Sequence, residues 1–270
     1  MAYPGLARRP VTVHQDGKEQ RGEDWLVEEA PVEIRYNGEA HAVMMVTPTD
    51  LQDFACGFSL SEGLVARAAD IRDMVVHELL EGYVVDVNAI MAMAVAGDAG
   101  SARLMPGRSG CGVCGSRRLE DVLRPTPPVP DGLVLGSDAL ERALAALAQR
   151  QPLNSHTGAV HAAAWASPDG EILHVREDVG RHNALDKLLG ALTRGNVDLC
   201  GGFVLVTSRA SYEMVTKTAR LGVGLLAAIS APTALAAQLA HACNLTLAGF
   251  VRPGRYVVYS HPQRLRDAAI

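Results

Sequence analysis

Apolar and polar residues alternate with a period of two along much of the first half of the chain, a pattern that predicts half-buried strands. The dipeptide Asn37-Gly38 interrupts the pattern and favours a tight hairpin turn. This half predicts two hairpins and a helix: strands over residues 32–36 and 40–46, a helix over 48–64, and strands over 74–78 and 83–89. We therefore expect residues 1–124 to form a smaller α+β module.

A different pattern follows a proline-rich connector at residues 125–130. Apolar runs typical of buried strands alternate there with segments that have the helical period. The predicted helices cover residues 138–150, 181–194, 212–221 and 233–242, with Ser137 as the N-cap of the first, and the predicted strands cover 160–167, 171–175, 203–207, 225–229, 245–250 and 256–259. Such alternation favours a layered α/β domain with a largely parallel sheet over residues 125–270.

Polar residues gather where the strands of this predicted sheet begin or end. Ligands bind at the carboxyl ends of strands in such sheets, and arginine side chains and helix N-termini suit phosphate groups. Turns rich in Arg, His and Ser occupy these positions at residues 156–158, 176–183, 207–211 and 250–255. They predict a site for a ligand that carries several phosphates. The side chains that either contact this ligand or cap the sheet edge are His156, Asp178, His182 and Ser208.

The most reactive candidate group is the pair of thiols in Gly110-Cys111-Gly112-Val113-Cys114-Gly115. Glycines around the cysteines give backbone freedom instead of packing, and residues 99–109 before them have no apolar period, so we expect a long loop. Arginines on both sides of the pair favour the thiolate form. A reactive thiol on a loop is typical of a nucleophile that transfers a group between two partners.

Other interpretations of the thiol pair fit the sequence less well. Disulfides are rare in the cytosol, and we expect this chain to lack a signal peptide. A zinc site needs four ligands, whereas the remaining cysteines are isolated in apolar surroundings and are expected to be buried: Cys56, Cys200 and Cys243. A thioredoxin-like pair directly follows a strand, and no strand is predicted next to this one.

Composition narrows the class of protein further. The chain is 48% hydrophobic and carries a formal net charge of −5, which argues against a general nucleic-acid-binding protein. It has no apolar run long enough to span a membrane. We therefore expect a cytoplasmic protein without a permanently bound metal ion.

Several of these motifs together resemble the FdhD family of formate dehydrogenase accessory sulfurtransferases. The resemblance extends from about residue 32 to 259 and is carried by residues 110–115, 156–161, 177–187 and 208–214. It implies a sulfur carrier that takes sulfur from a cysteine desulfurase. The sulfur then passes to the bis(molybdopterin guanine dinucleotide) form of the molybdenum cofactor before this cofactor enters formate dehydrogenase. The resemblance also implies a cytidine-deaminase-like larger domain and a homodimer.

The resemblance also assigns roles to particular residues. It implies that Cys111 forms the persulfide and that Cys114 is its companion. Cys114 either attacks Cys111 and releases the sulfur in reduced form, or stays passive. The implied cofactor-binding stretch is Phe250, Val251, Arg252, Pro253, Gly254 and Arg255. Two alternatives remain: a chaperone that binds the cofactor without sulfur transfer, and a thiol–disulfide oxidoreductase.

Overall fold

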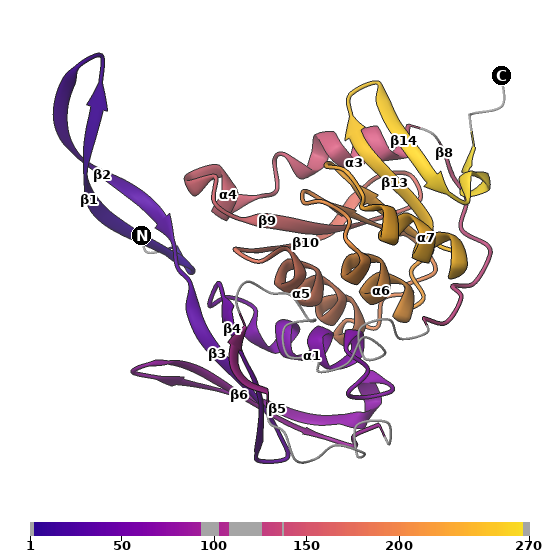
Figure 1. The fold of residues 1–270 in the computed structure, drawn as a ribbon, viewed down its shortest axis with the longest axis horizontal. Coiled ribbons are helices and arrows are strands. Elements are labelled where there is room, and N and C mark those ends of the chain that lie inside the picture. Colours follow the sequence, from indigo (N-terminus) through magenta and orange to yellow (C-terminus); the bar gives the residue numbers. More distant parts are fainter. Residues whose placement is uncertain (1–2, 93–102, 108–125, 137, 267–270) are drawn as a thin grey trace.

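The computed structural model describes residues 3–92, 103–107, 126–136 and 138–266. Cys111, Cys114 and the predicted N-cap Ser137 lie outside the described residues. The described chain is a mixed α/β structure with a five-stranded sheet, a six-stranded sheet and two small two-stranded sheets (Figure 1). Its described helices are all too short or too polar to cross a membrane.

The five-stranded sheet is built from the two hairpins predicted in the first half. Its strands are β3 (Ala30–Tyr36), β4 (Glu39–Val46), β5 (Ile71–Leu79), β6 (Gly82–Ala89) and β7 (Arg103–Gly107), in the order β5-β6-β3-β4-β7. Alternate residues of β3, Val32 and Ile34 among them, are buried in a core with helix α1 (Leu51–Ser61). Both hairpins and the helix are confirmed. The helix starts only after Asp50, whose backbone is left-handed at φ 53°.

Strand β7 contradicts the expectation of a loop over residues 99–109. It pairs in parallel with β4, at an edge of the five-stranded sheet. An open strand edge offers main-chain donors and acceptors to any extended segment, so β7 needs no apolar alternation. Because β7 ends at Gly107, a strand lies nearer to the cysteine pair in the sequence than expected.

The six-stranded sheet contains all six strands predicted in the second half. They are β9 (His161–Ala166), β10 (Ile172–Asp178), β11 (Phe203–Val206), β12 (Leu225–Ala228), β13 (Thr246–Arg252) and β14 (Arg255–Ser260), in the order β10-β9-β11-β12-β13-β14. The expectation of a largely parallel sheet is corrected, because only β11–β12 and β12–β13 pair in parallel. Tight turns join β9 to β10 and β13 to β14, and such short connections require antiparallel pairing.

Helices cover both faces of the six-stranded sheet. α5 (Arg181–Arg194), α6 (Tyr212–Arg220) and α7 (Ala234–Ala242) pack on one face, and α3 (Ala139–Leu147) packs on the other. Along β11, Val204 and Val206 face the first group of helices, whereas Phe203 and Leu205 face α3. A strand buried on both faces is a continuous apolar run, which explains why the sequence predicted it. The short helix α4 (Pro152–Thr157) and the strand pair β8 (Leu135–Gly136) and β15 (Leu265–Arg266) were not predicted.

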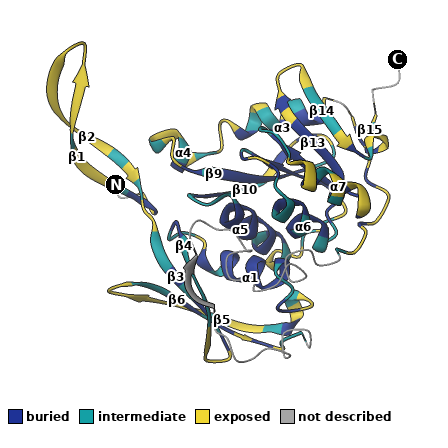
Figure 2. Cartoon of the chain, in the orientation of Figure 1, coloured by how far each residue is buried: buried dark blue, intermediate teal, exposed yellow. Residues whose placement is uncertain are grey.

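A hairpin of β1 (Leu6–Gln15) and β2 (Lys18–Val27) was also missed. It projects from the body of the molecule (Figure 1), and most of its residues are exposed (Figure 2). Its turn is Asp16-Gly17, in which both residues have positive φ. Asp-Gly is a strong hairpin signal, so the sequence did contain the information.

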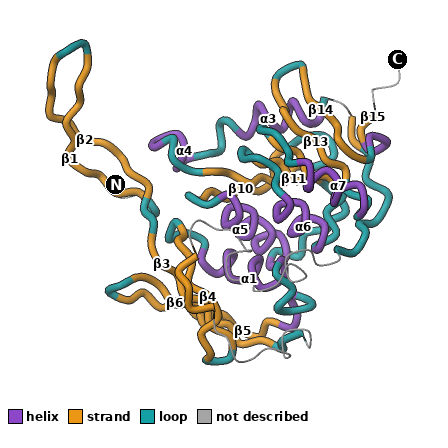
Figure 3. The backbone as a smooth tube through the Cα atoms, viewed as in Figure 1, coloured by secondary structure: helices purple, strands orange, loops and turns teal. Residues whose placement is uncertain are grey.

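Helix α1 lies between the two large sheets and packs closely against α5 (Figure 3). Two glycines make this contact possible. A Cβ atom at Gly57 of α1 would overlap the carbonyl oxygen of Asp186, and one at Gly190 of α5 would overlap the carbonyl oxygen of Asp53. The two helix backbones therefore meet directly, with no side chain between them at these positions.

Replacement of Gly57 by alanine tests this close contact. We expect Gly57→Ala to lower the free energy of unfolding by about 3 kcal/mol, the upper end of overpacking costs, because the overlapped atom belongs to backbone. Urea denaturation followed by circular dichroism measures the change. The control is Gly22→Ala in β2, where the added methyl meets Val13 at 3.9 Å and Val11 at 4.0 Å. Equal stability of the two variants contradicts the interpretation.

Candidate functional site

The four polar turns meet at one edge of the six-stranded sheet, as the sequence predicted. β10 and β11 end beside the start of the antiparallel strand β9, since Asp178 pairs with His161 and Val206 pairs with Ala163. β12 and β13 run parallel to β11 and therefore end at the same edge. We call this row of turns the ligand edge.

Main-chain hydrogen bonds tie neighbouring turns of the ligand edge together. The Thr233 N–H donates to the carbonyl of Ala210 at 3.0 Å, which joins the turns after β11 and β12. The Phe250 N–H donates to the carbonyl of Ser230 at 3.1 Å, which joins the turns after β12 and β13. The turns of the ligand edge that follow β11, β12 and β13 are therefore joined to one another.

The carboxylate of Asp178 is fully buried and is bound by protein groups. It forms an ion pair of 2.7 Å with Lys187 Nζ and accepts hydrogen bonds from the Thr47 N–H at 3.0 Å and from Asn183 Nδ2 at 2.9 Å. Burial lowers the pKa of Lys187, and the Asp178 carboxylate opposes this shift. These contacts bury Asp178 at the ligand edge and connect that edge to α5 and to Thr47.

A second buried cation joins α1, α5 and α6. Lys217 Nζ lies 2.8 Å from Asp186 Oδ2 and 2.8 Å from Glu62 Oε1, and Ser61 Oγ donates to Asp186 Oδ1 at 2.6 Å. Burial acts to lower the pKa of Lys217, but the two carboxylates outweigh it and raise the pKa. This network was not predicted from the sequence. The feature of the sequence that indicates such a network is a charged residue beside the apolar stripe of a predicted helix, such as Asp186.

His182 and Glu213 face each other between the first turns of α5 and α6. His182 is only 1% exposed, and its Nε2 lies 3.5 Å from Glu213 Oε2, which is longer than an ordinary hydrogen bond. Ser211 Oγ donates to Glu213 Oε2 at 2.7 Å. The interaction with His182, assisted by Ser211 and opposed by burial, holds the pKa of Glu213 well below its usual range. Glu213 is therefore ionised at neutral pH.

Arg181 adds a positive charge beside this pair. Arg181, the first residue of α5, is half-buried, and His161 begins the adjacent strand β9. Burial, together with the positive charges of Arg181 and His182, lowers the pKa of His161. Arg181 was not singled out from the sequence, although it lies inside the polar turn at residues 176–183.

The stretch from Phe250 to Arg255 forms the end of β13 and the turn into β14. Phe250 is 41% exposed and has φ 53°, and its exposed neighbours are Arg252, Pro253, Gly254 and Arg255. Val251 is instead fully buried in the core against α3. The expectation for Val251 is corrected to this extent: only its main chain can contact a ligand, because alternate side chains of a strand point inward.

The remaining predicted residues also lie along the ligand edge. His156 is exposed in α4, and its ring lies 4.9 Å from the ring of Tyr3 at the base of the projecting hairpin. Ser208 lies after β11, is 4% exposed, and donates from Oγ to the carbonyl of Arg209 at 3.0 Å. His156 thus stands next to the hairpin, whereas Ser208 follows a central strand.

The described cysteines have different surroundings. Cys56 and Cys243 are buried, as predicted, and burial raises the pKa of Cys56 to about 11, which keeps its thiol unreactive. Cys200 is exposed, contrary to the prediction, because it lies in the surface connection between α5 and β11. The part of the chain that the structure describes holds no group of three His, Cys, Asp or Glu residues that could bind a metal ion.

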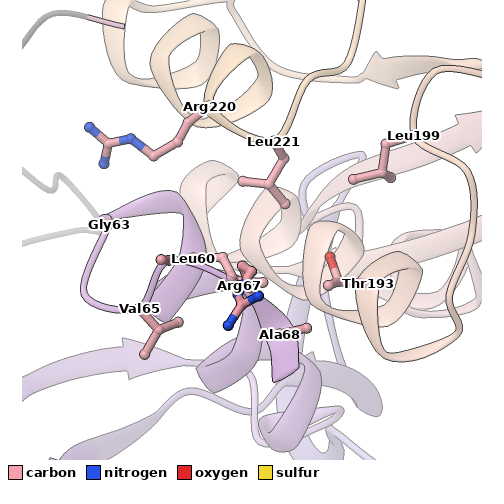
Figure 4. Close-up of a pocket in the computed structure, with 10 residues that line it drawn as sticks. Leu60, Gly63, Val65, Arg67, Ala68, Thr193, Leu199, Arg220 and Leu221 are labelled. Carbon is pink, nitrogen blue, oxygen red and sulfur yellow. The ribbon is translucent and has the colours of Figure 1, made fainter. Parts of the chain in front are cut away.

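A pocket of about 400 Å³ lies away from the ligand edge (Figure 4). It is lined by Leu60 near the end of α1, Thr193 near the end of α5, and Leu221 just after α6. The ligand edge adjoins the opposite, N-terminal ends of α5 and α6. The pocket therefore contains none of the residues that the sequence predicted for the site.

The buried pair of Asp178 and Lys187 can be tested by removing the cation. Lys187→Met is expected to lower the free energy of unfolding by about 3–5 kcal/mol, because it leaves a buried carboxylate without its partner. The matched control is Arg8→Met, since Arg8 and its partner Glu23 have side chains that are 60% and 55% exposed. The control should lose less than about 1 kcal/mol. Similar urea denaturation midpoints for both variants would show that the buried pair is unimportant.

Glu213→Gln is expected to change the pH dependence of stability. The pKa of Glu213 is lower in the folded protein than its ordinary value of 4.5. Its stabilising contribution is therefore complete above that value and is lost as the pH falls through the folded pKa. The variant should be less stable than the wild type at about pH 7, and the difference should shrink in acid. Urea denaturation at several pH values measures this, and a difference that is constant with pH excludes it.

Comparison with known proteins places this geometry in a family. Residues 27–266 match the model of the FdhD/NarQ family. The chain is 53% identical over 262 residues to the sulfur carrier protein FdhD of Xanthomonas euvesicatoria pv. vesicatoria, which covers 97% of this chain and 93% of that protein. It is 53% identical over 246 residues to the sulfur carrier protein FdhD of Cupriavidus necator, which covers 91% of this chain and 85% of that protein.

A solved structure supports the same assignment. A protein from Desulfotalea psychrophila described as a formate dehydrogenase accessory protein superposes with a TM-score of 0.80 at 26% sequence identity. The superposition covers 97% of this chain and 100% of that one. Family model, sequence relatives and fold agree, and the chain belongs to the FdhD/NarQ family.

Proposed function

We propose that this chain is a sulfurtransferase that carries sulfur for the maturation of formate dehydrogenase. In this proposal it takes sulfur from a cysteine desulfurase and delivers it to the bis(molybdopterin guanine dinucleotide) molybdenum cofactor, which is its substrate. The observation that carries the proposal is the glycine-bounded thiol pair Cys111 and Cys114 in a chain 53% identical to proteins named sulfur carriers.

The first step loads sulfur onto Cys111. Its thiolate attacks the terminal sulfur of the desulfurase persulfide, a new S–S bond forms at Cys111, and the desulfurase cysteine leaves as a thiolate. Oxidation states balance, because one persulfide is exchanged for another. Arginines on both sides of the pair favour the thiolate that starts the reaction.

The second step releases the sulfur to the molybdenum of the cofactor. A sulfido ligand is two electrons more reduced than persulfide sulfur, so the transfer needs a reductant. The Cys114 thiolate supplies it by attacking the inner sulfur of Cys111, which forms a disulfide and expels hydrosulfide. If Cys114 is passive, an external thiol acts as the reductant by attacking the same sulfur.

The ligand edge is the proposed cofactor site. Phe250 and its exposed neighbours, Arg252 and Arg255 among them, offer an aromatic ring and two guanidinium groups. Arginine binds phosphate in a two-pronged geometry, which suits the diphosphates of a guanine dinucleotide. His156, His182 and Ser208 complete the proposed edge.

Further features expected from the sequence or implied by the family resemblance belong to the same proposal. They are a boundary between two domains at residues 124 and 125, cytidine-deaminase-like layering of the larger domain, a homodimer and a cytoplasmic location. Helices on both faces of the six-stranded sheet are consistent with the proposed layering. The formal net charge of −5 is consistent with a partner other than nucleic acid.

Intact-mass spectrometry tests the sulfur-transfer step. After incubation with a cysteine desulfurase and cysteine, the wild-type protein should gain about 32 Da per sulfur atom, and a reducing agent should remove the gain. Cys111→Ala should gain no mass, whereas the control Cys200→Ala, which removes an exposed cysteine elsewhere, should gain it as the wild type does.

The outcomes separate this proposal from its alternatives. A Cys111→Ala protein that still acquires labelled sulfur rejects Cys111 as the carrier. A wild-type protein that binds guanine dinucleotide but never gains mass is a cofactor-binding chaperone. Turnover of generic disulfides without a nucleotide site indicates a thiol–disulfide oxidoreductase.

A further inference from the structure

Strand β5 is an edge strand of the five-stranded sheet, and most of its side chains are exposed. Apolar residues are among them: Val75 is 42% exposed, Leu79 is 51% exposed, and Leu80 in the turn that follows is 99% exposed. In β10, an edge strand of the six-stranded sheet that is described throughout, Leu173 alone is exposed. β5 also contains no proline or lysine, residues that commonly protect an edge. It is therefore a template on which another strand can pair.

The main chain of β5 directs polar groups out of the sheet along this edge. The Asn37 N–H donates to the Val87 carbonyl at 3.0 Å, so the main chain of Val87 is directed away from β5. Met74 lies opposite Val87. Because hydrogen-bonded and non-hydrogen-bonded pairs alternate in an antiparallel ladder, Met74 and Val76 direct their N–H and C=O groups outward. Gln52 Nε2 donates to the Met74 carbonyl at 3.0 Å, and a carbonyl can accept a second bond.

The charges of β5 have a self-complementary order. Apolar residues occupy positions 74–76, with Arg72 and Asp73 before them and His77 and Glu78 after them. When two copies of the strand pair antiparallel about the middle residue, Arg72 lies opposite Glu78 of the partner subunit. Asp73 then lies opposite His77 of the partner subunit, so each carboxylate faces a basic side chain. A register moved by one residue would place Asp73 opposite Glu78 of the partner subunit, which are like charges.

We propose that two copies of this chain pair antiparallel through β5, centred on Val75. In this register Met74 faces Val76 of the partner subunit, and the two residues exchange both of their main-chain hydrogen bonds. The two five-stranded sheets then form one continuous sheet, and the exposed apolar middle of each strand is covered by the other. The inference deepens the homodimer of the proposed function, on which it rests for the presence of a second copy, by naming the surface and the register.

Sedimentation equilibrium of the full chain tests the register through the dissociation constant of the dimer. Arg72→Glu places two glutamates opposite each other, and Glu78→Arg places two arginines opposite each other. Each variant should weaken the dimer by about tenfold or more. An equal mixture of the two variants should form dimers again, because each changed side chain then faces its opposite charge. The control Glu39→Arg reverses an exposed charge on β4 of the same sheet and should dimerise as the wild type does.

A second measurement needs no variant. The Val76 N–H of the wild type should exchange with deuterium more slowly in concentrated than in dilute protein, because dimerisation bonds it. Circular dichroism confirms that each variant is folded, and if one is unfolded, the exchange experiment decides. Exchange at Val76 that does not depend on protein concentration overturns the inference. Slower exchange only after a cysteine desulfurase or formate dehydrogenase is added assigns the edge to that partner and overturns it as well.

Failure of this inference is distinguishable from failure of the proposed function. A wild-type protein that stays monomeric overturns both the named surface and the homodimer. A dimer that neither charge reversal weakens, or that the mixture does not restore, overturns the surface and register but leaves the homodimer standing. The mass gain on Cys111 decides sulfur carriage separately in each case.

Discussion

The contact between α1 and α5 fixes how the two large sheets stand relative to each other. Gly57 and Gly190 let the helix backbones touch, and the buried cations Lys187 and Lys217 bridge elements on both sides of the contact. A buried ion pair adds little net stability, but a displaced partner leaves a charge buried and unpaired. The ion pairs therefore disfavour other arrangements of the helices, and the glycines supply the close approach that the preferred arrangement requires.

The contact between α1 and α5 connects the two parts of the proposed sulfur carrier. β7 runs toward the cysteine pair and is paired with β4, and Thr47 directly follows β4. The main chain of Thr47 binds both Asp178 and Lys187, which lie on the α5 side of the contact. Only Val179 and Gly180 separate Asp178 from the first turn of α5. Strand β7 and the edge proposed to hold the cofactor are thus attached to the same buried network through β4 and Thr47.

Sequence patterns predicted the elements better than the contacts between them. Alternation gave β3 and β4, and continuous apolar runs gave β11 and β12, because both patterns reflect burial within one element. β7 was missed because it pairs through its main chain at a sheet edge, and antiparallel β9 was taken as part of a mainly parallel sheet. Asp178 was correctly placed at the ligand edge, yet its burial depends on Lys187 and Thr47, which are distant in sequence. Arg181 was overlooked because a cation beside a strand end is common in ordinary turns.

Lys187 and Arg181 lie on the same helix, but they differ in how far the fold itself satisfies the charged side chain. Lys187 is fully buried, and the Asp178 carboxylate beside it neutralises its charge, so folding alone explains why a cation is tolerated there. Arg181 stands at the positive end of the helix with Nε buried and unsatisfied within the described structure. An acidic residue in that turn would stabilise α5 through the helix dipole. Folding alone therefore explains the cation at Lys187, whereas for Arg181 Nε the described structure holds no hydrogen-bond partner.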